Sequence, residues 1–361
     1  MMNRRTFMVT TMAAMTTVRS AVGAGPRTAG LYAPAEEAPH ARTWMCWAST
    51  PSVYGRDGGY TRAVQEALGR LAAAIAENEP VTMLAAAEHR GLARELCGPK
   101  VTLLDIPTDD MWARDSGPIF LTAEDGRRAV LDLNFNGWGG RQRHDIDRKV
   151  PSAIAAHLGR PYLRADVVGE GGGIEFDGEG TLILTDSCWV NDNRNPGMSQ
   201  QDIETALKES LGVETVIWLP GVRGQDVTDG HIDGSVRIVR PGLLMTSGYP
   251  DDDSDWGLAL AESTRILQRT RDARGRSFDI VHVPAALDSR SSHPDFFTSY
   301  ANYYVGNGAV YTPQFGDSAA DARAIETLGK LYPGRRVVAL EVDRIYENGG
   351  GIHCVTQQEP A

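Results

Sequence analysis

Five side chains that could perform chemistry stand in or beside glycine-containing turns, each followed by an apolar run. They are Asp115, Glu170, His231, Asp233 and Cys354. A cysteine attacks as its thiolate, so either its pKa must fall or a neighbouring group must accept its proton. Histidine, whose reference pKa is about 6.5, can exchange that proton near neutral pH. The sequence therefore predicts that Cys354 is a nucleophile and that His231 is its acid and base.

The carboxylates in this set indicate the charge of the substrate. Several anions around a thiolate oppose its ionisation unless a cation is bound among them. Attack on an amide would instead need donors to an oxyanion. A planar guanidinium resolves this conflict, because its N–H groups suit bidentate carboxylates and its charge offsets both the acids and the thiolate. We therefore expect a small cationic guanidine as the substrate.

Each of these residues also has a structural interpretation when it is taken alone. Asp115 follows Arg114 and could form a plain ion pair, and Glu170 could be an exposed acid in a turn. His231 and Asp233 could bind a metal ion, but no second histidine stands at helical or zinc-like spacing, so no metal is expected. The recurrence of the residues in similar settings favours a catalytic function.

Composition and charge exclude several other classes of function. The 361-residue chain has 47 acidic and 36 basic residues and a formal charge of −11, the wrong sign for a protein that binds nucleic acid. It contains no apolar run of about 20 residues that could span a bilayer, and no dinucleotide fingerprint. Cys46, Cys97 and Cys188 stand in apolar surroundings and are expected to be buried; the sequence leaves open whether they pair.

Strand and helix patterns alternate along the chain, which indicates an α/β fold. Helices are expected at residues 60–78, 147–158, 200–211, 255–271 and 319–331. Strands are expected at residues 43–48, 81–85, 118–121, 181–185, 235–239, 308–312 and 337–342. The clearest pattern is in 60–78, where Val64, Leu68, Leu71 and Ile75 recur at helical spacing.

The glycine-flanked polar segments recur at a loosely constant interval. The separations between Asp115, Glu170, His231 and Cys354 are 55, 61 and 123 residues, and a similar segment at 301–308 lies in the widest gap. The chain has 39 glycines, so some recurrence is expected by chance. Repetition of this kind predicts supersecondary units arranged radially or as a solenoid. It favours a propeller of βαβ-type units whose polar ends converge on one axis.

Residues 1–24 have the parts of an export signal. Paired arginines at positions 4 and 5 precede a short apolar stretch and a small-residue run that ends at Ala24, as in a signal peptide of the twin-arginine type. We expect transient contact with the twin-arginine export machinery and a periplasmic or secreted mature chain of residues 25–361. A cytoplasmic location is expected only if this interpretation of residues 1–24 is wrong.

Longer strings give a more specific resemblance, which runs from about residue 34 to residue 361. Together they are similar to motifs of the agmatine deiminase family, a member of the pentein group of guanidine-modifying enzymes. The strings are WARDSGP (112–118), EGGGIEFDGEGTLILT (170–185), NRNPGMS (193–199), DARGR (272–276), TPQFGD (312–317) and GGGIHCVTQQEP (349–360). The resemblance implies a single catalytic domain, a five-bladed pseudosymmetric α/β propeller without metal or cofactor.

The resemblance also implies a role for each chemical residue. Cys354 would be the nucleophile and His231 the acid and base. Glu170 would pair with the guanidinium and orient His231, while Asp115 and Asp233 would clamp the guanidinium nitrogens.

Further positions are expected to bind the substrate. Trp112 is similar to a tryptophan that lines the family's substrate slot. Asp226 and Gly349 are also expected to bind the substrate. The chain departs from the family pattern at Val227, where an acid is usual, and at Gly234, where asparagine is common. An arginine-rich stretch after the first strand is also replaced, by residues 54–60. These departures concern recognition of the distal amine of agmatine.

The expected reaction is hydrolysis of agmatine to N-carbamoylputrescine and ammonia through a covalent thiouronium on Cys354, a step toward putrescine. Three alternatives stay open. The chain could be a secreted peptidylarginine or free-arginine deiminase, an amidinotransferase, or a non-catalytic guanidine-binding protein. A homodimer is compatible with the sequence, which does not fix the oligomeric state.

Overall fold

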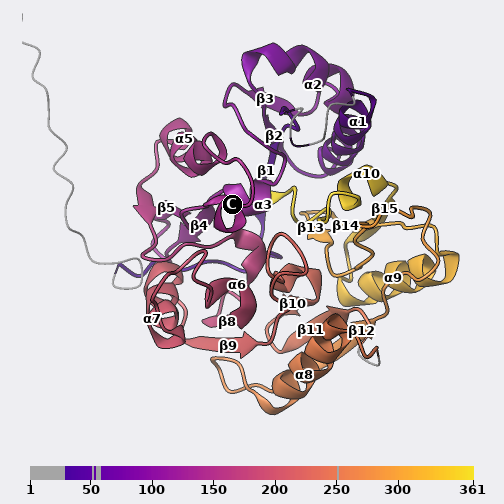
Figure 1. Ribbon diagram of the computed structural model, residues 1–361. Helices are drawn as coiled ribbons and strands as arrows, with labels where there is room; N and C mark the ends of the chain where they lie inside the picture. The colour runs from indigo at the N-terminus through magenta and orange to yellow at the C-terminus, as the bar shows by residue number, and fades with distance from the viewer. Residues whose placement is uncertain (1–28, 51–52, 54–57, 250–251) are drawn as a thin grey trace, which may run out of the picture.

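A computed structural model describes residues 29–50, 53, 58–249 and 252–361 (Figure 1). The expected signal segment 1–24 and most of the departure at 54–60 lie outside these residues. In the described part of the chain, no helix combines the length and apolar character needed to cross a bilayer.

The described residues form five separate sheets, four of which share one plan. In each of the four, a short antiparallel hairpin is followed by a helix and then by a third strand parallel to the second. The strands, sheet by sheet, are β4 Ile119–Thr122, β5 Arg128–Asp132 and β6 Tyr162–Arg164; β7 Ile174–Phe176, β8 Thr181–Thr185 and β9 Thr215–Leu219; β10 Val236–Arg240, β11 Leu243–Ser247 and β12 Asp279–Val283; β13 Tyr304–Val305, β14 Ala309–Pro313 and β15 Arg336–Leu340. The connecting helices are α5 Val150–Leu158, α7 Gln200–Leu211, α8 Asp255–Arg269 and α9 Ser318–Leu331.

The remaining sheet joins the two ends of the described chain. Its order is β16-β1-β2-β3, and the C-terminal strand β16 lies antiparallel to β1, with Trp44 opposite Gln357. The elements are β1 His40–Cys46, α1 Gly58–Ile75, β2 Val81–Leu84, α2 Arg90–Cys97, β3 Thr102–Leu104 and β16 Gln357–Pro360. In Figure 1 the units follow one another around the molecule in chain order, and the yellow C-terminal unit adjoins the indigo first one. Thus β16 supplies the antiparallel strand that a hairpin supplies in the other four sheets.

Short helical turns precede or connect these strands. They are η1 Ala87–His89, α3 Ala113–Ser116, α4 Gly137–Gly140, η2 Asp147–Lys149, η3 Gly171–Gly173, α6 Asp186–Trp189, η4 Ile232–Gly234 and α10 Asp343–Tyr346. The turns α3, η3 and η4 stand immediately before β4, β7 and β10, the first strands of three hairpins, and Cys354 stands just before β16. The same position in four of the five units therefore carries a chemical residue.

The helices form where apolar spacing and capping agree. Val64, Leu68, Leu71 and Ile75 of α1 are fully buried in the largest apolar core, as their spacing predicts. Helix α7 begins with a reciprocal capping box between Ser199 and Asp202 and ends at Gly212 in the left-handed region. Such local signals determine where the helices that connect the parallel strands begin and end.

The mixed α/β order predicted from the sequence is confirmed, while the boundaries of several elements differ. The strand expected at 43–48 is β1, which starts earlier and ends at Cys46, and the helix expected at 255–271 ends at Arg269. Cys46, Cys97 and Cys188 are buried in apolar clusters and unpaired, so their expected burial is confirmed.

Candidate active site

The thiol of Cys354 lies at the start of the last strand among polar groups from other units. Its Sγ is 3.6 Å from Oδ2 of Asp233 and 3.2 Å from Nδ2 of Asn302. The backbone carbonyl of Cys354 accepts a hydrogen bond of 3.0 Å from the amide of Arg114, which ties this loop to α3. The side chain is partly accessible. A nucleophile is thus held by three neighbouring units.

Gly172 marks the point at which the other groups meet. A Cβ atom placed on this glycine would lie 2.6 Å from Nδ1 of His231, 2.9 Å from Oδ1 of Asp115 and 3.2 Å from Oδ2 of Asp233. No side chain can occupy this position without displacing one of them. The run of glycines after Glu170 therefore lets four chemical groups approach one another closely.

His231 is surrounded by carboxylates. Its Nε2 is 3.2 Å from Oε2 of Glu170, and its Nδ1 is 3.7 Å from Oδ2 of Asp115. Burial alone would lower the pKa of His231, but Asp115, Glu170 and Asp233 outweigh burial and raise this pKa to about 9. The imidazole is therefore protonated at neutral pH, in the form that can donate a proton.

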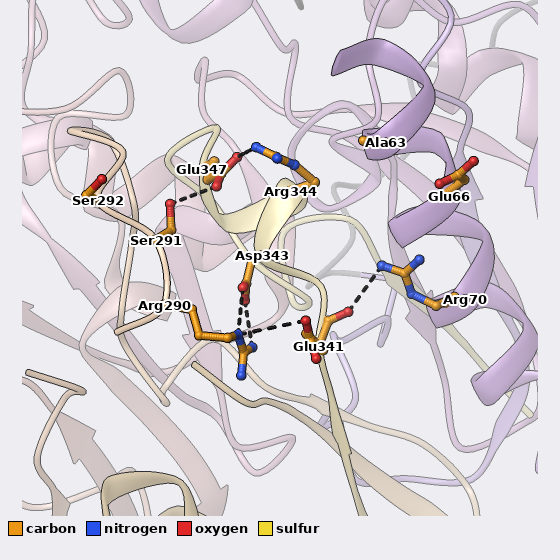
Figure 2. A pocket seen from close by; sticks show the side chains of 10 residues that line it. All are labelled: Ala63, Glu66, Arg70, Arg290, Ser291, Ser292, Glu341, Asp343, Arg344 and Glu347. Atoms are coloured by element: carbon orange, nitrogen blue, oxygen red, sulfur yellow. Dashed lines mark hydrogen bonds and ion pairs between the residues drawn. The ribbon is translucent and has the colours of Figure 1, made fainter. Parts of the chain in front are cut away.

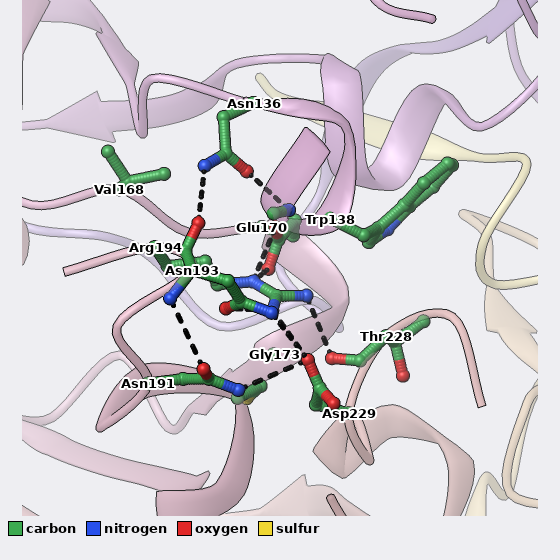
Figure 3. A network of polar contacts seen from close by, with 12 residues as sticks. Asn136, Trp138, Val168, Glu170, Gly173, Asn191, Asn193, Arg194, Thr228 and Asp229 are labelled. Carbon is green, nitrogen blue, oxygen red and sulfur yellow. Dashed lines mark hydrogen bonds and ion pairs between the residues drawn. The ribbon is translucent and has the colours of Figure 1, made fainter. Parts of the chain in front are cut away.

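Glu170 is held by a buried guanidinium that the sequence analysis did not identify (Figure 3). Nε of Arg194 donates to both carboxylate oxygens of Glu170, at 2.9 and 3.0 Å, and its Nη1 donates to Oδ2 of Asp229 at 2.9 Å. Burial acts to raise the pKa of Glu170, but Arg194 and the bond to His231 bring it below its ordinary value. Glu170 is thus an ionised carboxylate that fixes the ring of His231.

Asp115 is fixed by donors on two sides. Its Oδ2 accepts from Nε1 of Trp138 at 2.9 Å, and its Oδ1 accepts from the amide of Gly172 at 2.9 Å. Trp138 has a φ of 53°, in the left-handed region, and such a conformation persists only where its surroundings enforce it. Burial, opposed by His231 and reinforced by the nearby carboxylates, raises the pKa of Asp115. A bound cation would restore its charge.

Asp233 is supported by a second histidine, His353. Its Oδ2 lies 2.7 Å from Nδ1 of His353, and Nε2 of the same ring lies 2.8 Å from Oε2 of Glu36. Burial acts to raise the pKa of Asp233, but His353 and His231 outweigh it and lower this pKa. Asp233 is therefore the most firmly ionised acid beside the sulfur.

The pKa of the Cys354 thiol is shifted in the opposite direction from that of Asp233. Burial, followed by the negative charges of Asp233 and Asp115, raises the pKa of Cys354 well above its ordinary value. Without a ligand the site therefore pairs a neutral thiol with a protonated His231. A cation bound among the carboxylates would offset their charge and favour the thiolate, as the sequence argument requires.

The three expected substrate-binding residues occupy different surroundings. The ring of Trp112 packs over Gly350: a Cβ on that glycine would lie 2.5 Å from the ring and 3.3 Å from Sγ of Cys354. Gly349 is exposed and has a φ of 78°, and a Cβ placed on it would meet no atom within 4 Å. The carboxylate of Asp226 accepts from the amides of Thr228 and Gly230, at 2.8 and 3.1 Å. The structure thus brings Trp112 to the sulfur, while Asp226 closes the turn that leads to His231.

One cluster has the composition of a metal site. Ligand atoms of Glu36, Glu175 and His353 lie within 4.8 Å of one another. The guanidinium of Arg237 donates to Glu175 at 2.6 Å and to Glu36 at 2.8 Å, and it also stacks on Tyr303 at 4.5 Å. This arginine therefore supplies positive charge where a metal ion would.

A separate hollow of about 520 Å³ lies where α1, α10 and the loop at 290–292 meet (Figure 2). Its charged side chains pair with one another; for example, Arg290 binds Asp343 at 3.0 Å and Arg344 binds Glu347. It contains neither the sulfur nor the imidazole, so the polar centre around Gly172 is the better candidate for an active site.

Sequence reasoning missed four residues that hold the expected ones in place. They are Trp138, Arg194, Asn302 and His353. Asn302 lies in the polar segment 301–308 of the repeat, and Arg194 lies in the string NRNPGMS, so both stood in segments already singled out. Nothing in the local pattern of His353, beside the nucleophile, indicated its two carboxylate partners.

Comparison with known proteins gives consistent matches over nearly the whole chain. The family described as Porphyromonas-type peptidyl-arginine deiminase matches residues 32–360. An agmatine deiminase of Stutzerimonas stutzeri is 38% identical over 96% of this chain and 99% of its own length, and one of Ectopseudomonas mendocina is 39% identical over 93% and 97%. The solved structure of agmatine deiminase from Enterococcus faecalis superposes with a TM-score of 0.87 at 29% identity, covering 94% of this chain and 98% of that one.

Proposed function

This chain belongs to the Porphyromonas-type peptidyl-arginine deiminase family, and from that premise we propose that it hydrolyses agmatine to N-carbamoylputrescine and ammonia. The agmatine deiminases at 38 and 39% identity confirm the family predicted from the motifs. The observation that carries the proposal is the position of Sγ of Cys354, 3.6 Å from Asp233, an acid that meets His231 and Asp115 around Gly172.

The substrate guanidinium binds between the carboxylates. Asp115 and Asp233 take its nitrogens from two sides, and Glu170 adds a third negative charge next to His231. Bidentate contacts of this kind hold the planar group with its carbon facing the sulfur, about 3–3.5 Å away. Binding also supplies the positive charge that lets Cys354 ionise, and the thiol proton passes to solvent. The substrate therefore activates its own nucleophile.

The first half of the reaction expels ammonia. The thiolate of Cys354 attacks the guanidinium carbon, and a C–S bond forms as the planar carbon becomes tetrahedral. His231, protonated at neutral pH because its pKa is about 9, gives its proton to the departing nitrogen as the C–N bond breaks. The product is an S-alkylthiouronium on Cys354 and a neutral His231.

The second half uses the same histidine as a base. His231 takes a proton from water, and the resulting hydroxide adds to the thiouronium carbon. The C–S bond then breaks, and the hydroxyl proton of the adduct passes to the sulfur as the neutral ureide is released. Glu170, fixed by Arg194, keeps the ring of His231 oriented in both halves. The thiol and the protonated histidine are thereby restored.

We also propose that the five units are the blades of a single pentein propeller. The shared hairpin-and-crossover plan of four sheets, the closure of the fifth by β16, and the placement of chemical residues before the inner strands support this arrangement. The common axis would then pass near Gly172, where Asp115, His231 and Asp233 meet.

Ammonia release and ureide formation, measured over a panel of guanidines, test the proposed function. The panel contains agmatine, free arginine, arginyl peptides and guanidinobutyrate, with no acceptor amine added. We expect the highest kcat/KM with agmatine. Preferred turnover of arginyl peptides would favour the second candidate, because the matching family is described as peptidyl-arginine deiminase. Binding of agmatine without ammonia would show a guanidine-binding protein, and turnover that needs an acceptor amine would show an amidinotransferase.

We further propose that the mature enzyme is exported by the twin-arginine route and consists of residues 25–361. The paired arginines and the small-residue run that ends at Ala24 support this. The test is the N-terminal mass of the protein recovered outside the cytoplasm. We expect a chain that begins at Gly25, and we expect Arg4→Lys with Arg5→Lys to retain the full-length chain inside the cell. A full-length cytoplasmic product from the unaltered gene would contradict export.

A further inference from the structure

His353 is enclosed between two carboxylates that belong to different parts of the chain. Its Nδ1 lies 2.7 Å from Oδ2 of Asp233, and its Nε2 lies 2.8 Å from Oε2 of Glu36, while the ring is only 1% exposed. A carboxylate oxygen accepts hydrogen bonds, so each ring nitrogen needs its own proton to make both bonds. Two carboxylate partners, one at each ring nitrogen, fit a doubly protonated imidazolium.

Charge balance in the buried cluster supports the same protonation state. The acids around the ring are Asp233, Glu36 and Glu175, and the guanidinium cations are Arg237 and Arg114. Burial raises the pKa of Glu175, but its two oxygens accept from Nε of Arg237 at 2.6 Å and from the amide of Ile238 at 2.9 Å, as an ionised carboxylate does. With a third cation on His353 the charges of these acids and cations cancel.

The same oxygen of Asp233 connects this ring to the sulfur. Oδ2 of Asp233 is bound by His353 on one side and lies 3.6 Å from Sγ of Cys354 on the other. Nδ2 of Asn302 also approaches this oxygen, at 3.3 Å. The rotamer of Asp233 is therefore fixed by His353 and Asn302.

We propose that His353 is a positioning residue of the deiminase, a buried imidazolium that fixes Asp233 and keeps it ionised to receive the substrate guanidinium. This inference rests on the proposed function. His353 acts through Asp233 and touches neither the sulfur nor the reacting carbon. Its bond to Glu36 extends the support of the site to residue 36, which is 317 positions away in the chain.

The pH dependence of substrate binding follows from the groups that face Asp233. These are His353, His231, Cys354, Asn302 and the charge of Arg237, with Asp115 as the neighbouring acid. His353 is the strongest of the groups that lower the pKa of Asp233. In His353→Gln, Asp233 loses a cation and its pKa rises, so a larger fraction of Asp233 is protonated as the pH falls.

Two measurements test this inference on the mature chain, residues 25–361. The first is the protonation of His353 in ¹⁵N-histidine-labelled protein without substrate, by correlation of ring nitrogens and protons, with assignment by His353→Gln. Because a carboxylate lies at each ring nitrogen, we expect both nitrogens to carry protons in the unaltered protein at neutral pH. In Glu36→Gln, we expect His353 to lose one of these protons. A neutral ring in the unaltered protein at neutral pH would overturn the proposal.

The second measurement is steady-state kinetics with agmatine for His353→Gln, Glu36→Gln and the remote control His89→Gln. We expect His353→Gln to raise KM about tenfold with a smaller fall in kcat, and to move the acid limb of kcat/KM to higher pH, since each tenfold step corresponds to about 1.4 kcal/mol of lost binding. Glu36→Gln should raise KM and move the acid limb of kcat/KM to higher pH by smaller amounts. His89→Gln should match the unaltered enzyme. Equal losses in kcat at every pH, with KM and the acid limb unchanged, would overturn the positioning role.

The two proposals fail separately. Absence of turnover on every guanidine would refute the proposed function while leaving the protonation of His353 measurable. A neutral His353 in an enzyme that does turn over agmatine would refute this inference alone. If His353→Gln does not fold, Glu36→Gln reports on the same bridge from its other end, because Glu36 does not contact Asp233.

Discussion

Sγ of Cys354 lies 3.6 Å from Oδ2 of Asp233, so the nucleophile is in contact with an acid whose pKa is lowered. An arrangement of this kind suppresses the thiolate in the free enzyme and permits it only when a cation enters. The relationship accounts for two features at once: the surplus of carboxylates around a cysteine, and the selectivity for a positively charged substrate. The predictions below follow from it.

The close approach at Gly172 can be tested by adding one carbon. In Gly172→Ala the new Cβ would lie 2.6 Å from Nδ1 of His231 and 2.9 Å from Oδ1 of Asp115. We expect kcat/KM with agmatine to fall about 100-fold or more, because a misplacement of about 1 Å at a reacting centre can cost that much. Gly91→Ala, in α2, is the matched control, since its Cβ would meet no atom within 4 Å. Unchanged kinetics in Gly172→Ala would mean that the centre lies elsewhere.

The pH profile reports on His231. The imidazolium form is needed to protonate the leaving nitrogen, and its fraction declines as the pH rises through the pKa of about 9. We therefore expect kcat/KM for agmatine to stay high at neutral pH and to fall above about pH 9. A decline that starts near pH 6.5, the ordinary value for histidine, would show that the surrounding carboxylates do not raise this pKa.

Removal of the buried guanidinium should damage both stability and catalysis. Arg194 and its partners Glu170 and Asp229 are almost fully buried, so Arg194→Gln removes the buried cation that these two carboxylates share. We expect the free energy of unfolding to fall by about 3–5 kcal/mol, with a loss of kcat because Glu170 no longer orients His231. Denaturant unfolding and steady-state kinetics measure the two effects.

An exposed arginine serves as the control for that experiment. Arg127 pairs with Asp125 at 2.7 Å, but both side chains are more than half exposed. Arg127→Gln should therefore leave the unfolding transition and kcat unchanged. Equal losses in the two variants would indicate a general effect of lost positive charge instead of a specific role for Arg194.

The predictable part of this protein is the part encoded in local segments. Asp115, Glu170, His231 and Cys354 could be identified because each stands in a glycine-containing turn before a strand, and the helix α1 because its apolar residues keep one period. Strands as short as β6 Tyr162–Arg164, with two exposed residues of three, carry too little alternation to be recognised.

The residues that support the site could not be predicted in the same way. Arg194 reaches Asp229 across 35 positions, and His353 reaches Asp233 across 120 and Glu36 across 317. Whether an arginine or a histidine is buried against acids depends on which units become neighbours, and local spacing does not contain that information. The pairing of β1 with β16, which brings the two ends of the described chain together, is equally non-local.

The most direct test of covalent catalysis by Cys354 is ureide and ammonia production from agmatine by the unaltered enzyme and by Cys354→Ser, with the fold of both checked by circular dichroism. We predict equal amounts of N-carbamoylputrescine and ammonia from the unaltered enzyme and neither product from the folded serine variant. Ammonia release by Cys354→Ser at the rate of the unaltered enzyme would contradict the account.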